Sequence, residues 1–430
     1  MVRARRVCIR LFLRAPHDNG ARRTHKGCAR NWLHGLTRIG YLSYALSVRI
    51  KVPSARAKLI RDLAAAFLRL GLTAFGGPAA HIAMMEEEFV RRRRWLSHDE
   101  FLDMLGASNL VPGPSSTEMA IHIGNQRGGG IGLLAAGVCF ILPAMLLVMG
   151  CAWAYATFGS LPQLQGILYG VKPVIIAVVM QALWILGRAA IKNKFFAVLG
   201  LLATASALAG ANLIAILLAV GAVSTFRTWI KERGDAANIF AAPLAMTSTA
   251  LTAAVPSSLT GIFLIFLKFG AVIFGSGYVL LAFLQADLVD RLHWLTQAQL
   301  LDAVAIGQVT PGPVFTTATF IGYLLGGVRG AVIATVAIFL PGFVFVAASH
   351  PLIPRIRRSK LAGAFLDGVN VGAVALMLAV TYQLGRAAML DFVTAAIAAL
   401  SAVALLYFRI NSAWLILAGA VFGLASMLWL

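Results

Sequence analysis

The stretch Asn109-Leu110-Val111-Pro112-Gly113-Pro114 returns almost unchanged as Gln308-Val309-Thr310-Pro311-Gly312-Pro313. The second copy lies 199 residues further along the chain (109 to 308), and Trp95-Leu96 returns at the same shift as Trp294-Leu295. Proline lacks a backbone N–H and glycine is conformationally free, so Pro-Gly-Pro interrupts an α-helix. Both copies lie in apolar surroundings. The sequence therefore predicts a tandem duplication with one broken helix in each half, a pattern typical of membrane transporters.

Composition places this chain in a lipid bilayer. Hydrophobic residues make up 60% of the 430 residues and charged residues only 12%, whereas a soluble domain carries roughly 25% charged residues. A membrane span needs about 20 apolar residues, or fewer where a helix is short or broken. We therefore predict an all-α polytopic membrane protein. Its apolar stretches are 131–158, 163–186, 195–209, 213–226, 331–348, 361–384, 392–406 and 412–430.

The net charge of +21 is unevenly distributed. Residues 1–58 hold fourteen Lys and Arg against a single acid, Asp18. The remaining charge is scattered among loops, which is typical of the positive-inside rule and argues against nucleic acid as a partner. The basic segment has no apolar core of signal-peptide length. It is either a disordered extension or the product of a gene start placed too early.

The duplication divides the chain into four parts: a basic extension (1–58), a first membrane repeat (59–227), a linker (228–258) and a second membrane repeat (259–430). Each repeat holds about five or six transmembrane segments. The positive loop charge swaps sides between the repeats. Arg91–Arg94 in the first repeat correspond to a loop with only Arg291 in the second, while Arg355–Lys360 in the second correspond to an uncharged loop in the first. This favours inverted repeats. Parallel repeats remain the alternative, because inversion puts the basic N-terminus on the unexpected side.

Each proline break is followed by hydroxyl side chains: Ser115, Ser116 and Thr117 in the first repeat, Thr316 and Thr317 in the second. The first N–H groups of a helix have no intrahelical partner and lie at the positive end of the helix dipole. Such a helix start binds tetrahedral oxyanions. Two starts brought together would form one central pocket. The plain alternative is a pair of proline kinks with no binding role.

Glu118 allows two interpretations. With Ser115 it fits a capping box, in which it would only satisfy a backbone N–H. Alternatively, an acid beside an anion site repels the anion while ionised and admits it once protonated, which would couple transport to protons. Its counterpart in the second repeat is Thr317, so the acid occurs once.

Two cations occupy equivalent positions inside apolar segments, Arg69 and Lys268. They either attract an anion or extend to the membrane interface. The glycine-rich segments that follow allow close helix approach. Asp103 and Asp302 also match, and we expect them to act at helix N-termini. The candidate substrate-binding residues are Arg69, Gly76, Gly77, Asn109, Pro112, Gly113, Pro114, Ser115, Ser116 and Thr117 in the first repeat, and Lys268, Gly275, Ser276, Gly277, Gln308, Thr310, Pro311, Gly312, Pro313, Thr316 and Thr317 in the second.

Other chemistries lack the residues they need. No Gly-x-x-x-x-Gly-Lys-Ser/Thr motif is present for ATP, and the four cysteines form no Cys-x-x-Cys pair,. His81 and His122 have no duplicated partner, and we expect ordinary packed histidines. We find no nucleophile–base pair. The sequence therefore predicts no enzyme, no metal site and no cofactor.

The motifs resemble the chromate ion transporter family. The first repeat carries Phe-Gly-Gly-Pro78 with His81, then Glu100-Phe101, Asn-Leu-Val-Pro-Gly-Pro-Ser-Ser-Thr117 and Phe-Ile-Leu-Pro143. The second carries Phe-Gly-Ser-Gly277 and Gln-Val-Thr-Pro-Gly-Pro313, with glycine where the first has Pro78. The resemblance covers residues 60–430, which corresponds to the long, two-domain form.

This resemblance implies a secondary transporter with two halves of opposite topology in the bacterial inner membrane. It would export chromate, driven by the proton motive force, and so give chromate resistance. Sulfate shares the charge and tetrahedral shape of chromate, so uptake of sulfate or another oxyanion is one alternative and a passive anion channel is another. A homodimer is an option that the sequence leaves open.

Overall fold

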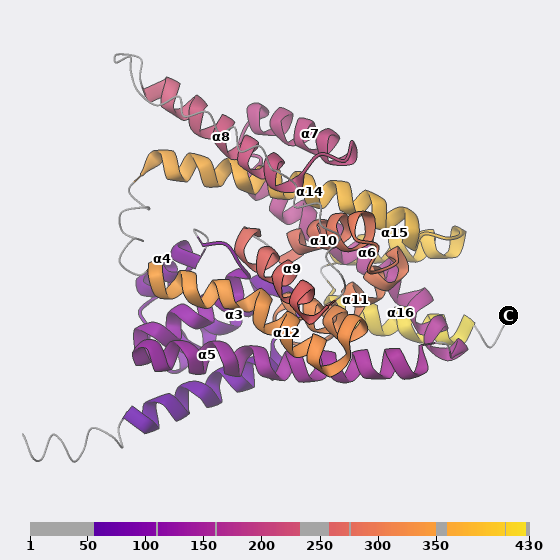
Figure 1. Cartoon of the computed structure of the whole chain (residues 1–430), viewed down its shortest axis with the longest axis horizontal. Helices are drawn as coiled ribbons and strands as arrows, with labels where there is room; N and C mark the ends of the chain where they lie inside the picture. Colours follow the sequence, from indigo (N-terminus) through magenta and orange to yellow (C-terminus); the bar gives the residue numbers. More distant parts are fainter. Residues whose placement is uncertain are drawn as a thin grey trace, which may run out of the picture. The chain divides into compact units, whose positions relative to one another are not determined.

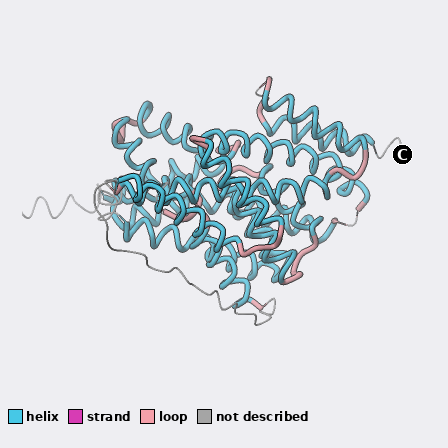
Figure 2. Tube along the Cα trace, turned by 90° about the horizontal axis from the view of Figure 1, so that it is seen from above, coloured by secondary structure: helices cyan, strands magenta, loops and turns pink. Residues whose placement is uncertain are grey.

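The computed structural model describes residues 56–108, 111–159, 161–232, 258–274, 277–349, 359–408 and 410–426. Within these ranges the chain forms helices and connecting turns, with no strand (Figure 2). The all-α prediction is therefore confirmed. Most of the predicted N-terminal extension and linker, together with Asn109, Gly275 and Ser276, lies outside the described residues.

The first repeat opens with a helix over residues 56–73. The second opens with α9, Leu259–Val272. Figure 1 shows α7 and α8 of the first repeat beside α14 of the second, so the two repeats pack on each other. The first repeat continues with α3 (Gly77–Glu86), the π-helix η1 (Glu87–Arg92), α4 (His98–Ser108), α5 (Ser115–Phe158), α6 (Pro162–Ala190), α7 (Lys194–Leu208) and α8 (Leu213–Glu232). The second continues with η2 (Gly277–Val279), α10 (Leu280–Leu284), the π-helix η3 (Gln285–Arg291), α11 (Gln297–Val309), η4 (Val314–Thr316), α12 (Thr317–Ser349), α14 (Lys360–Ala388), α15 (Phe392–Leu406) and α16 (Ser412–Ser426).

Local backbone geometry repeats along with the sequence. Two residues after the end of each π-helix stands a residue of positive φ, Arg94 at 51° and His293 at 52°. Further on, α5 is interrupted at Gly129 (φ 61°, ψ −153°), and α12 at Gly327 (φ 61°, ψ −150°). Glycine adopts this backbone conformation without a Cβ clash. The same sequence signals thus produce the same turns twice, as a duplication predicts.

The repeats are related by a symmetry that reverses helix direction. Gly187, late in α6, lies against Val374 of α14, and its counterpart Gly385, late in α14, lies against Ile176 of α6. Val374 is itself the counterpart of Ile176, so the contact is reciprocal, as a two-fold relation requires. From Ile176 to Gly187 the contacts advance along α6 while they go back along α14, from Gly385 to Val374, so the equivalent helices run antiparallel. Inverted repeats require this arrangement.

Five helices are long and apolar enough to cross a membrane. Among the described residues they are Ser115–Phe158, Pro162–Ala190, Leu213–Lys231, Val314–Ala348 and Lys360–Ala388. Helices α7, α15 and α16 are shorter but equally apolar, and they leave large side chains uncovered. Leu201 is 67% exposed, Leu400 71% and Trp414 67%. Apolar side chains on the outside are expected where lipid is the solvent.

Candidate functional site

The two Pro-Gly-Pro breaks are each bonded to the opposite repeat. The Gly113 N–H donates to the carbonyl of Ile273 at 2.7 Å, and the Gly312 N–H donates to the carbonyl of Ala74 at 2.8 Å. Ile273 and Ala74 are equivalent residues, each directly after the first helix of its repeat. Each break therefore satisfies a carbonyl that the end of a helix leaves without a partner. These paired bonds place both breaks at the junction between the repeats.

The central glycine of each break has a role that no other residue fills. Gly113 has φ 140° and Gly312 φ 99°, in the region that favours glycine,. The flanking prolines lack an N–H, so the glycine supplies the donor for the inter-repeat bond. A Cβ on Gly312 would collide with the methyl group of Ala144 in α5.

Gly312→Ala should therefore lower the melting temperature of the purified chain in detergent clearly more than Gly210→Ala does. Gly210 also has positive φ, 83°, but nothing lies within 4 Å of its added Cβ. The control thus carries only the backbone cost of roughly 1–2 kcal/mol, while Gly312→Ala adds a packing clash. An equal fall in melting temperature in the two variants would show that the close contact between Gly312 and Ala144 does not affect stability.

The start of α5 is equipped to bind an anion. Its N-cap is Pro114, and the first bonds of the helix run from the N–H groups of Thr117 and Glu118 to the Pro114 carbonyl, at 2.8 and 3.0 Å. The N–H groups of Ser115 and Ser116 precede these bonds and therefore have no intrahelical acceptor. Ser115, Ser116 and Thr117 are all buried. The Thr117 hydroxyl has no hydrogen-bond partner among the described residues.

The second break is built differently. After Pro313 the chain forms the 3-10 turn η4, and α12 begins only at Thr317. The Thr316 hydroxyl donates to the Pro313 carbonyl at 2.7 Å, and the Thr317 hydroxyl donates to the Val314 carbonyl at 2.8 Å. Both hydroxyl protons are thus used within the segment. A single cavity lined by the hydroxyls of both breaks stays a prediction, but the start of α5 has the donors that remain available.

Glu118 is fully buried, and neither carboxyl oxygen has a hydrogen-bond partner among the described residues. Its side chain folds back over Gly113 and also lies close to Gly342 of α12. The capping-box interpretation is wrong, because the N-cap of α5 is Pro114 and no side chain caps the helix. Proline takes the capping position, so Ser115 becomes the first helical residue and its hydroxyl comes one position too late.

Further buried polar groups surround the junction. His81 Nε2 lies 3.1 Å from the Ala74 carbonyl, the same oxygen that accepts from Gly312, so His81 is a packed histidine as predicted. Gly77 lies against the hydroxyl of Tyr278, which is 3.4 Å from the Gln308 side-chain oxygen.

The remaining predicted residues lie close to the breaks in sequence and have structural contacts of their own. Gly76 (φ 98°) is the N-cap of α3, Gly277 packs on Val314 and Phe315, and the Thr310 hydroxyl donates to the Ile306 carbonyl at 2.9 Å. Pro112 is half-buried, and Pro311 and His122 are buried.

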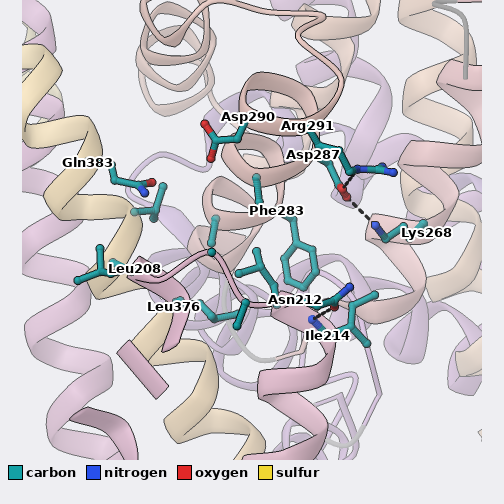
Figure 3. Close-up of a pocket in the computed structure, with 18 residues that line it drawn as sticks. Leu208, Asn212, Ile214, Lys268, Phe283, Asp287, Asp290, Arg291, Leu376 and Gln383 are labelled. Carbon is teal, nitrogen blue, oxygen red and sulfur yellow. Dashed lines mark hydrogen bonds and ion pairs between the residues drawn. The ribbon is translucent and has the colours of Figure 1, made fainter. Parts of the chain in front are cut away.

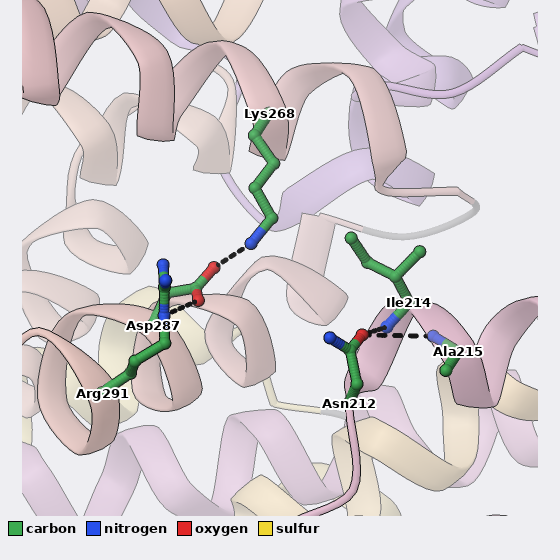
Figure 4. A network of polar contacts seen from close by, with 6 residues as sticks. All are labelled: Asn212, Ile214, Ala215, Lys268, Asp287 and Arg291. Carbon is green, nitrogen blue, oxygen red and sulfur yellow. Dashed lines mark hydrogen bonds and ion pairs between the residues drawn. The ribbon is translucent and has the colours of Figure 1, made fainter. Parts of the chain in front are cut away.

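The two predicted cations line other cavities. Lys268 Nζ lies 2.6 Å from Asp287 Oδ2, beside a cavity of about 490 Å³ to which the Pro-Gly-Pro residues do not contribute (Figure 3). Asp287 also accepts from Arg291 Nε at 2.9 Å, so its carboxylate is bonded to both Lys268 and Arg291 (Figure 4). Arg69 lines a smaller cavity of about 160 Å³ with Glu88. Lys268 therefore has an acidic partner instead of an empty anion site.

A charge pair that the sequence did not predict, between a half-buried lysine and a buried aspartate, joins the repeats. Lys172 Nζ of α6 lies 2.8 Å from Asp302 Oδ1 of α11, and the Tyr155 hydroxyl donates to Asp302 Oδ2 at 2.9 Å. The N-terminal role expected of Asp302 is wrong, because Thr296 caps α11 with a capping box to Gln299. The available signal was a lone lysine inside the apolar stretch 163–186, since a cation in a span usually has a partner. Asp103 is exposed on α4, past its first turn.

Comparison with known proteins gives one consistent result. A family profile described as "Chromate transporter" matches residues 61–225 and again residues 260–424. A chromate transport protein of Cupriavidus metallidurans is 33% identical over 377 residues, covering 86% of this chain and 93% of that protein. A probable chromate transport protein of Synechococcus elongatus is 30% identical, covering 78% and 87%. A chromate transport protein of Pseudomonas aeruginosa is 32% identical, covering 76% and 81%. No solved structure matches the chain.

Proposed function

Since the chain belongs to the chromate transporter family, we propose that it is a secondary transporter that exports chromate across the bacterial inner membrane. The proton motive force drives export, and export gives chromate resistance. The observation that carries this proposal is the pair of inter-repeat bonds, from Gly113 to Ile273 and from Gly312 to Ala74. These bonds lie beside the start of α5, with its available donors and the buried Glu118, at the contact between two antiparallel repeats.

Substrate binding takes place at the start of α5. The N–H groups of Ser115 and Ser116, with the Thr117 hydroxyl, donate to the oxygens of a tetrahedral dianion, and the helix dipole adds favourable charge. Chromate has four equivalent oxygens and no hydrogen to donate, so a site made of donors suits it. The absence of a hydrogen-bond partner for the Thr117 hydroxyl among the described residues supports this assignment.

Proton coupling is assigned to Glu118. As a carboxylate it would place a negative charge over Gly113, where it repels an arriving dianion. As a neutral acid it leaves the dipole of α5 and the N–H groups free to act on the substrate. Binding of the anion and protonation of Glu118 then favour each other, so one proton leaves with each anion. The complex of a dianion and one proton carries a net negative charge, so the electrical component of the proton motive force, negative inside the cell, drives export.

Alternating access follows from the inverted repeats. In such transporters the substrate site stays near the repeat interface while one repeat rocks against the other. The bonds from Gly113 and Gly312 are equivalent, so rocking in one direction would break one of them and leave the other intact. The site at the junction would thereby open to one side of the membrane at a time.

Uptake of labelled chromate into everted membrane vesicles tests the function. Export in the cell corresponds to uptake by these vesicles, so we expect accumulation in energised vesicles that contain the chain and little in vesicles without it. An uncoupler should abolish accumulation, and excess sulfate should compete. Uptake whose rate does not change with pH would indicate a passive channel, because a pore needs no titrating acid. Accumulation only in right-side-out vesicles would indicate an uptake permease.

A further inference from the structure

Four cations of the first repeat stand where its last helices end and begin. Arg188 lies near the end of α6, Lys192 in the turn that follows, Lys194 at the start of α7 and Arg227 near the end of α8. The Arg227 guanidinium lies 4.0 Å from the centre of the Phe195 ring, which places the end of α8 against the start of α7. We call these four cations the basic corner.

Most of the positive charge of the basic corner is not neutralised within the protein. Lys192 Nζ lies 2.7 Å from Asp367 Oδ2, early in α14. Among the residues that the structure describes, no carboxylate pairs with Arg188, Lys194 or Arg227. The guanidinium groups of Arg188 and Arg227 lie over aromatic rings instead, which leaves their N–H groups able to donate to an anion,.

An uncovered apolar face begins directly at these cations. On α7, Lys194, Val198 and Leu201 have the spacing of one helix face, and Val198 and Leu201 are 57% and 67% exposed,. On α8, the exposed Val223 lies one turn before Arg227. Figure 1 shows α7 and α8 along an outer edge of the molecule, packed on α14. A phospholipid has the matching form, with a charged phosphate at one end and apolar acyl chains below it.

The equivalent corner of the second repeat lacks these cations. Lys192-Asn193-Lys194 is replaced there by Leu390-Asp391-Phe392. Leu390 and Phe392 are 74% and 86% exposed, while Asp391 caps α15 and accepts from the Tyr169 hydroxyl at 2.6 Å. Because α6 and α14 run antiparallel, the two corners lie at opposite ends of this helix pair and meet opposite leaflets of the bilayer. The difference in charge therefore points to an anionic ligand that one leaflet supplies.

We propose that the basic corner binds the headgroup of an anionic phospholipid of the cytoplasmic leaflet, with the acyl chains along the exposed face of α7. Lys194 and Arg227 contact the phosphate from two helices, and Arg188 and Lys192 add positive charge. Lysine and arginine concentrate on the cytoplasmic side of membrane proteins, and anionic lipids of that leaflet attract them. The bound lipid bridges α7 and α8 at the rim of the molecule, and its binding is independent of the oxyanion substrate.

Native mass spectrometry of the purified full-length chain in detergent, titrated with phosphatidylglycerol or phosphatidylcholine, tests this site. Phosphatidylglycerol is anionic and should show a tight binding step that the zwitterionic phosphatidylcholine lacks. Each Lys or Arg beside an anionic lipid contributes about fivefold in affinity, so Lys194→Gln combined with Arg227→Gln should weaken this step about 25-fold. Glycerol phosphate has the charge without the acyl chains and should not displace the lipid.

Two cations of the second repeat provide the matched control. Arg329→Gln combined with Arg386→Gln removes the same amount of charge outside the basic corner and should leave the tight step unchanged. A second variant adds a site instead of removing one, so it does not depend on how well the first variant folds. Leu390→Lys, Asp391→Asn and Phe392→Lys together copy Lys-Asn-Lys into the second repeat and should create another step selective for phosphatidylglycerol.

Three results would overturn the lipid site. The first is equal binding of the two lipids by the wild type. The second is an equal loss of affinity in the control and in the variant of Lys194 and Arg227. The third is a dimer that forms without bound lipid and dissociates in the variant of Lys194 and Arg227, because the corner would then bind a second copy of the chain.

Discussion

Replacement of Glu118 by glutamine is expected to abolish the proton-driven accumulation of chromate while chromate exchange across the membrane continues. Glutamine keeps the shape of the protonated acid but cannot ionise. The start of α5 therefore remains able to receive the anion, and the coupling to protons is lost. In vesicles with an imposed pH gradient, acidic outside, accumulation by Glu118→Gln should fall to the level of wild type treated with an uncoupler.

Glu100 provides the matched control for this variant. Its carboxylate accepts from the Ser97 N–H at 2.8 Å and the Ser97 hydroxyl at 3.0 Å, and the Glu100 N–H donates back to that hydroxyl at 3.2 Å. Glutamine serves equally well in such a capping box, so Glu100→Gln should accumulate chromate normally. Full gradient-driven accumulation by Glu118→Gln would show that Glu118 takes no part in coupling.

Lys172→Met is expected to cause the largest loss of stability among single substitutions of exposed or half-buried charges. Asp302 is buried, and its carboxylate is held by Lys172 at 2.8 Å and by Tyr155 at 2.9 Å. Removal of the lysine leaves a buried carboxylate without its counter-charge, which costs about 3–5 kcal/mol. Tyr155 also packs on Phe320 of α12, with ring centroids 5.3 Å apart. The loss of stability therefore extends to α11, which carries Asp302, and to α12, the two helices on either side of the second break.

The double variant Lys172→Met with Asp302→Leu should recover most of this stability, because an apolar pair of similar volume often replaces a buried ion pair without loss. Lys192→Met, in the exposed pair with Asp367, should cost no more than about 1 kcal/mol,. Thermal unfolding in detergent measures all three variants. A double variant no more stable than Lys172→Met alone would mean that the cost does not come from the uncompensated acid.

The duplicated features were predictable from sequence because each occurs twice. A proline-flanked glycine cannot continue a helix, so the breaks at Gly113 and Gly312 follow from local chemistry. Equal shifts between the copies indicate equivalent positions in the fold. The swap of loop charges favoured inversion, and the antiparallel contact of α6 with α14 agrees with it.

The residues that differ between the repeats were harder to predict. Asn370 stands where the first repeat has Lys172, so comparison of the repeats gives no reason to single out this lysine. Lys268 and Asp287 are 19 residues apart and lie on different elements, so helix spacing does not indicate their contact. Ser115 and Glu118 have the spacing of a capping box. In the structure Pro114 is the N-cap instead, and nothing in the local sequence pattern shows which of the two residues, Pro114 or Ser115, takes that position.

The position of chromate in the molecule tests the central claim most directly. A chromium anomalous difference map, from crystals of the purified chain grown with chromate, locates the substrate without assumptions about its ligands. The account predicts a peak within hydrogen-bond reach of the backbone N–H groups of Ser115 and Ser116, next to Glu118. Chromate at high occupancy elsewhere, with no peak at the start of α5, would contradict it.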